Sequence, residues 1–237
     1  MTPRILSAGD RSLLVQVDDL QATLAVAALL QRARLPEIED LIPAAETVLV
    51  RVKPGTDIRE INTRITDLLG GTQVDTDRTS TGHPLLIPVK YDGPDLADVA
   101  GATGLSVAEV IAAHTGTTWR AAFVGFAPGF AYLAGGDARL QVSRRAESRT
   151  TVPAGSVALA GEYSAVYPRR SPGGWQLIGT TTATLWDVDA EPPAAIQPGS
   201  WVRFVDVDAA DENETQAEES TDSGSTPKAV AVTGARS

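Results

Sequence analysis

The chain has 237 residues and a mass of 24.8 kDa, enough for one large domain or two small ones, and its 43% hydrophobic and 21% charged residues are typical of a globular protein. It contains no cysteine and only two histidines, which excludes disulfides, thiolate metal sites, thiol catalysis and a metal site of three histidines from one chain. The formal net charge of −10 at pH 7 argues against nucleic-acid binding, which requires basic surfaces.

Residues 1–80 are predicted to form an N-terminal α+β domain. Two short apolar runs flank a turn at Gly9-Asp10, and two amphipathic segments each begin next to an Asp. The expected order is two strands, helix, strand, helix: Arg4–Ser7, Leu13–Val17, a helix over 20–34 capped by Asp18 or Asp19, Thr47–Lys53, and a helix over 58–69 capped by Asp57 and ended by Gly70-Gly71. Residues 74–82 show no apolar periodicity and are interpreted as a linker.

Residues 84–207 are predicted to form an all-β domain with two short helices near its start. The helices are expected over 95–100 and 106–114, the second opened by Ser106 and Glu109 at capping-box spacing. Beyond Gly116, short apolar runs alternate with Gly and Pro clusters, a pattern typical of an antiparallel barrel or sandwich. These runs are 118–126, 131–133, 157–159, 165–167, 175–179, 184–186 and 201–205.

Residues 208–237 are predicted to be a disordered acidic tail. Seven acids and no base lie between Asp208 and Asp222, and no aromatic residue follows. Such a tail is either an interaction segment or a solubilising extension. The first residues lack the apolar core of a signal peptide, and no apolar stretch is long enough to span a bilayer, so a cytoplasmic location is expected.

The segment 123–179 carries the most information about function because Gly, Pro and aromatic residues concentrate there. Gly allows close approach of the backbone and Pro fixes it, so such clusters build rigid loops around a bound group, or simply form tight barrel turns. The chain contains neither a G-x-x-x-x-G-K-[ST] phosphate loop nor a G-x-G-x-x-G fingerprint. Its serines are outside any G-x-S-x-G elbow, and nothing nominates a Ser-His-Asp triad.

Several motifs occur in a diagnostic order: Ala8-Gly-Asp-Arg-Ser-Leu-Leu-Val15, Tyr91-Asp-Gly-Pro-Asp-Leu96, Gly104-Leu-Ser-Val-Ala-Glu-Val-Ile111 with His114, Gly125-Phe-Ala-Pro-Gly-Phe-Ala-Tyr-Leu133, Val152-Pro-Ala-Gly-Ser-Val157 with Ala160-Gly161, and Ser171-Pro-Gly-Gly-Trp-Gln-Leu-Ile-Gly179. With these motifs the chain resembles the allophanate hydrolase subunit 1 / KipI family, mostly described as the B subunit of the bacterial ATP-dependent 5-oxoprolinase. The resemblance covers most of the chain except the tail.

The resemblance implies a small N-terminal α+β domain followed by a cyclophilin-like β-barrel. It also implies two partners, a protein similar to the 5-oxoprolinase C subunit (allophanate hydrolase subunit 2-like) and a LamB/YcsF-type A subunit, with which family members cleave 5-oxo-L-proline to L-glutamate using ATP. The expected cofactor is ATP, bound through the complex, with no metal or biotin on this chain. Two alternatives remain open: a carboxyltransferase-like or allophanate hydrolase-type subunit that acts on a urea-derived substrate, or a kinase-inhibiting regulator of the KipI type.

The sequence departs from the family pattern at three places. Residues 162–165 lack the usual Gln and Gly, residues 180–182 are threonines where the family has a cation, and Ser143 replaces a Pro before Arg144. If the missing groups contact the substrate, activity or specificity is altered.

The candidate catalytic residues are His114, at the end of a predicted helix where the dipole favours a protonated ring, and Glu162, the one acid in the central motifs. An arginine beside the motifs suits a substrate carboxylate, and aromatic rings suit a pocket wall or a subunit interface. The candidate substrate-binding residues are Phe126, Pro128, Gly129, Phe130, Arg144, Arg149, Gly155, Ser156, Gly173, Gly174 and Trp175. We expect the motifs that begin at Gly125 and at Ser171 to line one pocket at the contact with the C-type subunit.

Overall fold

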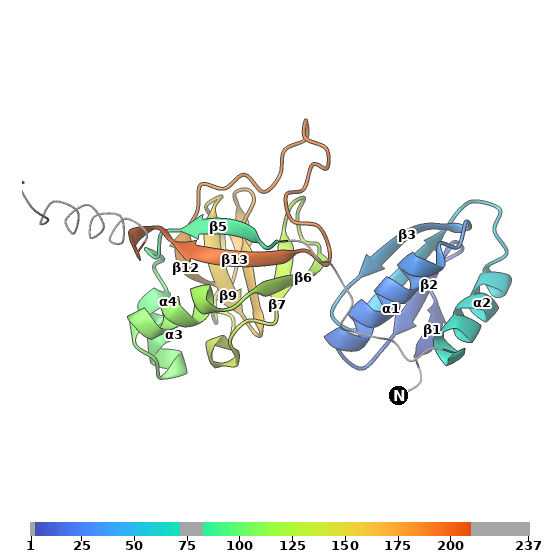
Figure 1. Ribbon diagram of the computed structural model, residues 1–237, viewed down its shortest axis with the longest axis horizontal. Coiled ribbons are helices and arrows are strands. Elements are labelled where there is room, and N and C mark those ends of the chain that lie inside the picture. The colour runs from blue at the N-terminus through green and yellow to red at the C-terminus, as the bar shows by residue number, and fades with distance from the viewer. Residues whose placement is uncertain (1–2, 72–82, 210–237) are drawn as a thin grey trace, which may run out of the picture.

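A computed structural model describes residues 3–71 and 83–209 of the chain. Its first part is an antiparallel four-stranded sheet in the order β1-β2-β4-β3, with two helices packed on it (Figure 1). The elements are β1 (Arg4–Ser7), β2 (Ser12–Gln16), α1 (Leu20–Ala33), β3 (Ile38–Pro43), β4 (Thr47–Val52) and α2 (Ile58–Gly71).

Alternating side chains of the central strands form the core of this sheet. Val48 and Val50 of β4 and Val15 of β2 are fully buried, and Ile61 and Ile65 of α2 pack against them. Strands with period two and a helix with period 3.6 therefore turn their apolar faces toward one another.

The predicted cap of the first helix is confirmed at Asp19, whose carboxylate accepts the N–H of Ala22 at 2.8 Å. The helix ends at Arg34, which has a left-handed φ of 45°, two residues before Pro36. Strand β3 was not predicted. This edge strand is half-exposed, contains the acids Glu39 and Asp40 and has a bulge between Ile38 and Asp40, so it lacks a regular apolar alternation.

The second part contains the expected barrel. Seven strands follow the order β12-β9-β10-β7-β6-β13-β5, and only the pair β13–β5 is parallel. A bridge between Lys90, just after β5, and Thr180 at the end of β12 joins the two edges through paired backbone hydrogen bonds of 2.8 Å. The strands are β5 (Leu85–Val89), β6 (Trp119–Val124), β7 (Ala131–Ala134), β9 (Ser156–Ala160), β10 (Tyr163–Val166), β12 (Gln176–Thr180) and β13 (Trp201–Asp206).

Two helices cover one end of the barrel, α3 (Leu96–Thr103) against β12 and α4 (Val107–Gly116) against β13 (Figure 1). The capping box predicted at Ser106 and Glu109 is confirmed. Among the described residues no single helix is long and apolar enough to cross a membrane. Helices α3 and α4 reach the required length and apolar composition only when taken together, and they are bent by 90° at the break between them.

A small two-stranded sheet, β8 (Arg149–Val152) with β11 (Ser171–Gly173), was not expected, because both strands lie in segments rich in Arg, Pro and Gly. The predicted strand 184–186 is wrong. Only the isolated bridge Trp186–Ala194 occurs there, within a long connection from β12 to β13 that extends away from the barrel (Figure 1). The whole predicted linker, 74–82, and residues 210–237 of the predicted tail lie outside the described residues.

Candidate functional site

Three loop segments enclose a cavity of about 250 Å³ beside the barrel, called here the aromatic pocket. They are the β6–β7 loop, the stretch before β8 and the turn around β11. The lining residues are Phe126, Phe130, Tyr132, Arg144, Ser148, Tyr167, Pro172, Gly173, Gly174 and Trp175. The two Gly- and Pro-rich motifs therefore meet at one pocket, and Arg144 lies beside them.

Phe130 organises the wall of the aromatic pocket. Its ring lies edge-to-face against Tyr132, Tyr167 and Trp175, with centroids 5.1, 5.3 and 5.7 Å apart. Phe130 is 1% exposed and Trp175 5%, whereas Phe126 is 58% exposed. Edge-to-face packing is the preferred geometry of aromatic pairs, so the deep wall is rigid and Phe126 forms the rim.

The backbone at the rim is held in an unusual conformation. Phe126 has a φ of 64°, in the left-handed region that a residue with a side chain rarely adopts. Short hydrogen bonds close the loop around it, from the N–H of Ala127 to the carbonyl of Gly125 at 2.7 Å and from the N–H of Phe130 to that of Ala127 at 3.0 Å. Strain of this kind concentrates at ligand-binding loops, because the surrounding structure must stabilise it.

Gly173 is required by the floor of the aromatic pocket. A Cβ at this position would lie 2.2 Å from the hydroxyl of Tyr167, which is 2% exposed. Burial raises the pKa of Tyr167, a change that the backbone N–H of Trp175 and the charges of Arg144 and Arg149 oppose. The phenol is therefore neutral at neutral pH and keeps its hydroxyl hydrogen.

Of the two predicted substrate arginines, only Arg144 lines the aromatic pocket, and its side chain is exposed. Arg149 instead donates from Nη2 to Oδ1 of Asp95 at 2.7 Å, and Arg145 donates from Nη1 to the same oxygen at 2.7 Å. Arg149 is therefore paired with a carboxylate that is 2% exposed, and its role in substrate binding stays a prediction.

His114 lies in the barrel core. Its ring stacks on Phe204 with centroids 4.2 Å apart, Nδ1 lies 2.7 Å from the hydroxyl of Tyr91, and Nε2 lies 2.8 Å from Oγ of Ser164. Burial lowers the pKa of His114 to about 3, so the ring is neutral, contrary to the protonated ring expected at a helix end. The proposed acid–base role stays a prediction, and the 0% exposed side chain lies outside the aromatic pocket.

The other candidates lie elsewhere. Glu162 is exposed on the β9–β10 turn. Burial, and to a smaller extent the hydrogen bond with Glu162, raise the pKa of the neighbouring Tyr163 phenol to about 12. Gly155, with a φ of 80°, forms the β8–β9 turn, and a Cβ there would lie 2.3 Å from the carbonyl oxygen of Thr181. Ser156 is buried at the start of β9. None of these three lines the aromatic pocket, and neither do the divergent positions 162–165 and 180–182.

Pro128 and Gly129 line a second cavity, of about 400 Å³, called here the loop groove. It lies between the β6–β7 loop and the long β12–β13 connection, and Phe126 borders both cavities. Gly129 has a φ of 78°, and a Cβ there would lie 2.8 Å from Cβ of Trp186. Three of its lining residues, Val124, Phe126 and Trp186, are 36%, 58% and 40% exposed, so large apolar side chains gather at this groove.

Tyr167, Ser148 and Pro172 also line the aromatic pocket but were not among the predicted site residues. Pro172 belongs to the motif that begins at Ser171, and Tyr167 lies in the segment 123–179 rich in Gly, Pro and aromatic residues, which was the available signal, whereas no signal pointed to Ser148. Within the described part of the chain, no group of three or more His, Cys, Asp or Glu side chains could hold a metal ion.

Comparison with known families gives one match that covers most of the chain. The family described as "Carboxyltransferase domain, subdomain C and D" matches residues 3–196. Among curated proteins, the 5-oxoprolinase B subunit of Escherichia coli O157:H7 is 48% identical over 122 residues, 50% of this chain and 56% of that protein. The protein of the same name from Bacillus subtilis (strain 168) is 43% identical over 128 residues, 53% of each chain. The matches thus span a little over half the length of these relatives.

Solved structures also match most of this chain. TTHA0988 is 35% identical with a TM-score of 0.69 over 83% of this chain and 40% of its own. PH0987 from Pyrococcus horikoshii, a conserved uncharacterized protein, is 32% identical with a TM-score of 0.53 over 88% of this chain and 99% of its own. The Kluyveromyces lactis urea carboxylase is 17% identical with a TM-score of 0.67 over 92% of this chain and 23% of its own, a likeness of fold alone.

Proposed function

The chain belongs to the family of carboxyltransferase domains, subdomains C and D. We propose that it is the B subunit of an ATP-dependent 5-oxoprolinase complex. This complex cleaves 5-oxo-L-proline to L-glutamate. The observation that carries the proposal is the aromatic pocket, in which two recognised motifs and Arg144 come together. Relatives named as 5-oxoprolinase B subunits, 48% and 43% identical to this chain, support it.

The chemistry of the aromatic pocket suits a small cyclic acid. Its apolar rings can cover the faces of a five-membered lactam. Its volume of about 250 Å³ lies below the range of about 300–1,000 Å³ for pockets that bury drug-sized ligands, which favours a smaller ligand. The guanidinium of Arg144 can bind the substrate carboxylate through two parallel hydrogen bonds. The neutral hydroxyl of Tyr167 offers a hydrogen bond to the lactam oxygen. We therefore assign substrate binding to the aromatic pocket.

We assign ATP binding to the partner proteins, because this chain contains no phosphate-loop sequence. The proposed partners are a C-like subunit, similar to allophanate hydrolase subunit 2, and a LamB/YcsF-type A subunit, which together with this chain form a cytoplasmic hetero-oligomer. The loop groove is the proposed contact with the C-like subunit, since exposed Phe126 and Trp186 supply aromatic anchors of the kind that dominate binding energy at interfaces.

The proposed domain organisation follows the four-stranded and the seven-stranded sheet. Residues 1–80 form an N-terminal α+β domain, residues 84–207 form a cyclophilin-like barrel domain, and residues 208–237 form an acidic tail. In this organisation the barrel domain carries the aromatic pocket, and the substrate site requires no residue of the N-terminal domain.

Affinity purification of the tagged full chain from its own cells tests the assignment of partners. The proposal expects the C-like subunit to be recovered in stoichiometric amount, and to be lost when Phe126 is changed to Glu. Arg203→Glu is the matched control, because Arg203 is exposed on β13 and lines neither cavity. Recovery of a histidine kinase or of a biotin-carrying protein in place of the C-like subunit would contradict the proposal.

A further inference from the structure

Asp95 begins helix α3 but does not cap it. At the start of α1, Asp19 accepts a backbone N–H, and at the start of α4, Ser106 does the same. Asp95 makes no such bond, although an Asp at this position ordinarily stabilises the helix by capping it. Its carboxylate instead binds groups outside helix α3.

The carboxylate of Asp95 accepts three short hydrogen bonds from two other parts of the chain. Oδ1 accepts from Nη1 of Arg145 and from Nη2 of Arg149, both at 2.7 Å, and Oδ2 accepts the backbone N–H of Leu177 at 2.6 Å. The backbone N–H of Asp95 in turn donates to the carbonyl of Leu177 at 2.9 Å. One side chain thus links the start of α3, strand β12 and the segment before β8.

This carboxylate is ionised. Burial, the largest single effect, would raise the pKa of Asp95, but the hydrogen bonds from Arg149 and Leu177 and the charges of both arginines together lower it. A buried charge persists only when it is paired in this way, and removing one partner of such a pair is strongly destabilising.

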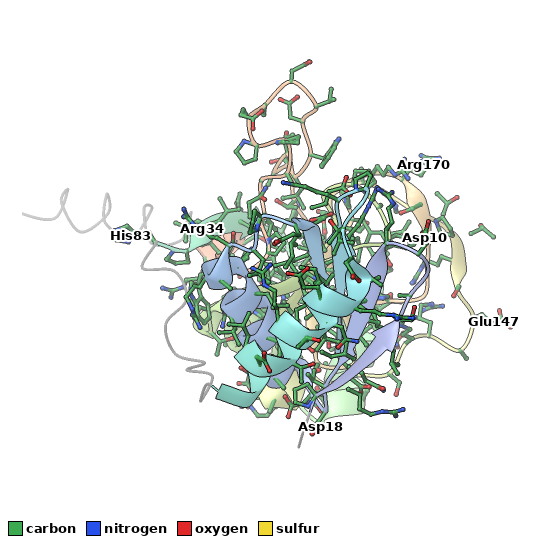
Figure 2. All side chains as sticks on the ribbon, turned by 90° about the vertical axis from the view of Figure 1, so that its right-hand side faces the viewer. Asp10, Asp18, Arg34, His83, Glu147 and Arg170 are labelled. Atoms are coloured by element: carbon green, nitrogen blue, oxygen red, sulfur yellow. The ribbon has the colours of Figure 1, made fainter. Side chains whose placement is uncertain are left out.

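The segment that holds the two arginines also forms one side of the aromatic pocket. Arg144 and Ser148 line the pocket, and each immediately precedes an arginine that binds Asp95. Residues 143–148 belong to no helix or strand. The N–H of Arg145 donates to the carbonyl of Gly174 at 2.8 Å, and the side-chain amide of Gln176 donates to the carbonyl of Ser143 at 3.1 Å. The bonds to Asp95 add a charged contact at each arginine of the segment. Glu147 of this segment and Arg170, just before β11, project from the same side of the molecule (Figure 2).

We propose that Asp95 is a positioning residue, which holds Arg144 and Ser148 at the aromatic pocket through Arg145 and Arg149 without touching the substrate. The part of this inference that concerns substrate rests on the proposed function. Loss of the carboxylate would loosen the segment 143–149, which would lose both ion pairs and keep the backbone bond from Arg145 to Gly174. The guanidinium of Arg144 would then no longer occupy a defined place at the aromatic pocket.

Hydrogen exchange of the full chain tests the structural part directly, with Asp95→Asn compared against wild type. We expect peptides covering 143–149 to exchange about tenfold faster in the variant, while peptides of β2 and β4 keep their wild-type rates. Asp98→Asn is the matched control, since it makes the same charge change on the exposed face of the same helix and should leave the segment unchanged. Unchanged exchange at 143–149 in Asp95→Asn would overturn the proposal.

If Asp95→Asn exchanges rapidly everywhere because it fails to fold, Arg145→Gln replaces it. Arg145 is 33% exposed at its side chain, and Arg149 would still neutralise Asp95, so this variant should fold and show the same local increase. A wild-type exchange rate at 143–149 in this variant would equally overturn the proposal.

Kinetics of the reconstituted complex test the functional part. We expect the variant with the loosened segment to show a KM for 5-oxoproline raised about tenfold and a kcat changed less than threefold. The reason is that Arg144 no longer orients the substrate carboxylate, while the groups that react with the substrate remain in place. An unchanged KM in a variant with a loosened segment would contradict the positioning role. If the wild-type complex does not turn over 5-oxoproline at all, the proposed function fails, while the exchange result still decides whether Asp95 holds the segment.

Discussion

Acidification should destabilise the folded chain through His114, whose side chain has no exposed surface. Burial lowers the pKa of this ring to about 3, whereas the unfolded chain has an ordinary histidine with a pKa of about 6.5. Below pH 6.5 the unfolded state takes up a proton that the folded state does not bind, so the free energy of unfolding falls as the pH decreases from 6.5 toward 3. Between pH 8 and pH 5 the expected loss is about 2 kcal/mol.

Urea unfolding at pH 8, 6.5 and 5 measures this loss. In His114→Gln the titrating group is gone, so the difference between pH 8 and pH 5 should shrink by about 2 kcal/mol, although stability at pH 8 also falls because Tyr91 and Ser164 lose a matched partner. His83→Gln is the matched control, since His83 is exposed, and it should retain the wild-type pH dependence. Equal pH dependence in wild type and His114→Gln would refute the reasoning.

Four further changes test the pocket, the scaffold and the tail. Gly173→Ala should lower the free energy of unfolding by about 1–3 kcal/mol, because its Cβ would displace a buried tyrosine hydroxyl, as urea unfolding would show. Arg144→Glu should change the free energy of unfolding by less than about 0.5 kcal/mol but impair 5-oxoproline use by the complex. Arg149→Glu should lower the free energy of unfolding by about 3 kcal/mol or more, because it leaves Asp95 facing a like charge. Urea unfolding and kinetics of the complex measure the two effects. Truncation after Val207 should leave the thermal midpoint unchanged, because the removed residues are acidic and lack aromatic groups.

Each of these changes has its own control or contrary result. Gly101 lies within α3 with open space around it, so Gly101→Ala should raise the free energy of unfolding by about 0.5–1 kcal/mol. If Gly101→Ala lowered the free energy of unfolding as much as Gly173→Ala, local packing would not be the cause of the effect at Gly173. Equal destabilisation by charge reversal at Arg144 and Arg149 would contradict the distinct environments described for them. A midpoint lowered by several degrees on truncation would mean that the tail packs on the body.

The sequence predicted those features that depend on local patterns. Capping at Asp19 and Ser106 follows from side chains and backbone a few residues apart, and both caps are present. The meeting of the two Gly- and Pro-rich motifs at one pocket followed from the resemblance and from the residue types that build rigid loops. The two caps need no knowledge of the three-dimensional arrangement, whereas the meeting of the two motifs joins segments that lie far apart in the chain.

Features that depend on distant partners were missed. Arg149 and its partner Asp95 are separated by 54 residues, and no periodicity links them. His114 was interpreted by its place at a helix end, but its environment is set by Phe204, which belongs to the last strand of the barrel. Edge strand β3 was missed because partial exposure removes the alternation on which recognition of a strand depends.

The central claim is that this chain works as the B subunit of a 5-oxoprolinase, and release of glutamate from 5-oxo-L-proline tests it most directly. The assay uses the purified full chain alone, then with the C-like subunit, then with the C-like and A-type subunits together, each with and without ATP. The account predicts ATP-dependent glutamate release only with all three components, and its reduction by Arg144→Glu but not by Arg203→Glu. Turnover by the single chain, or no turnover by the complete set, would contradict it.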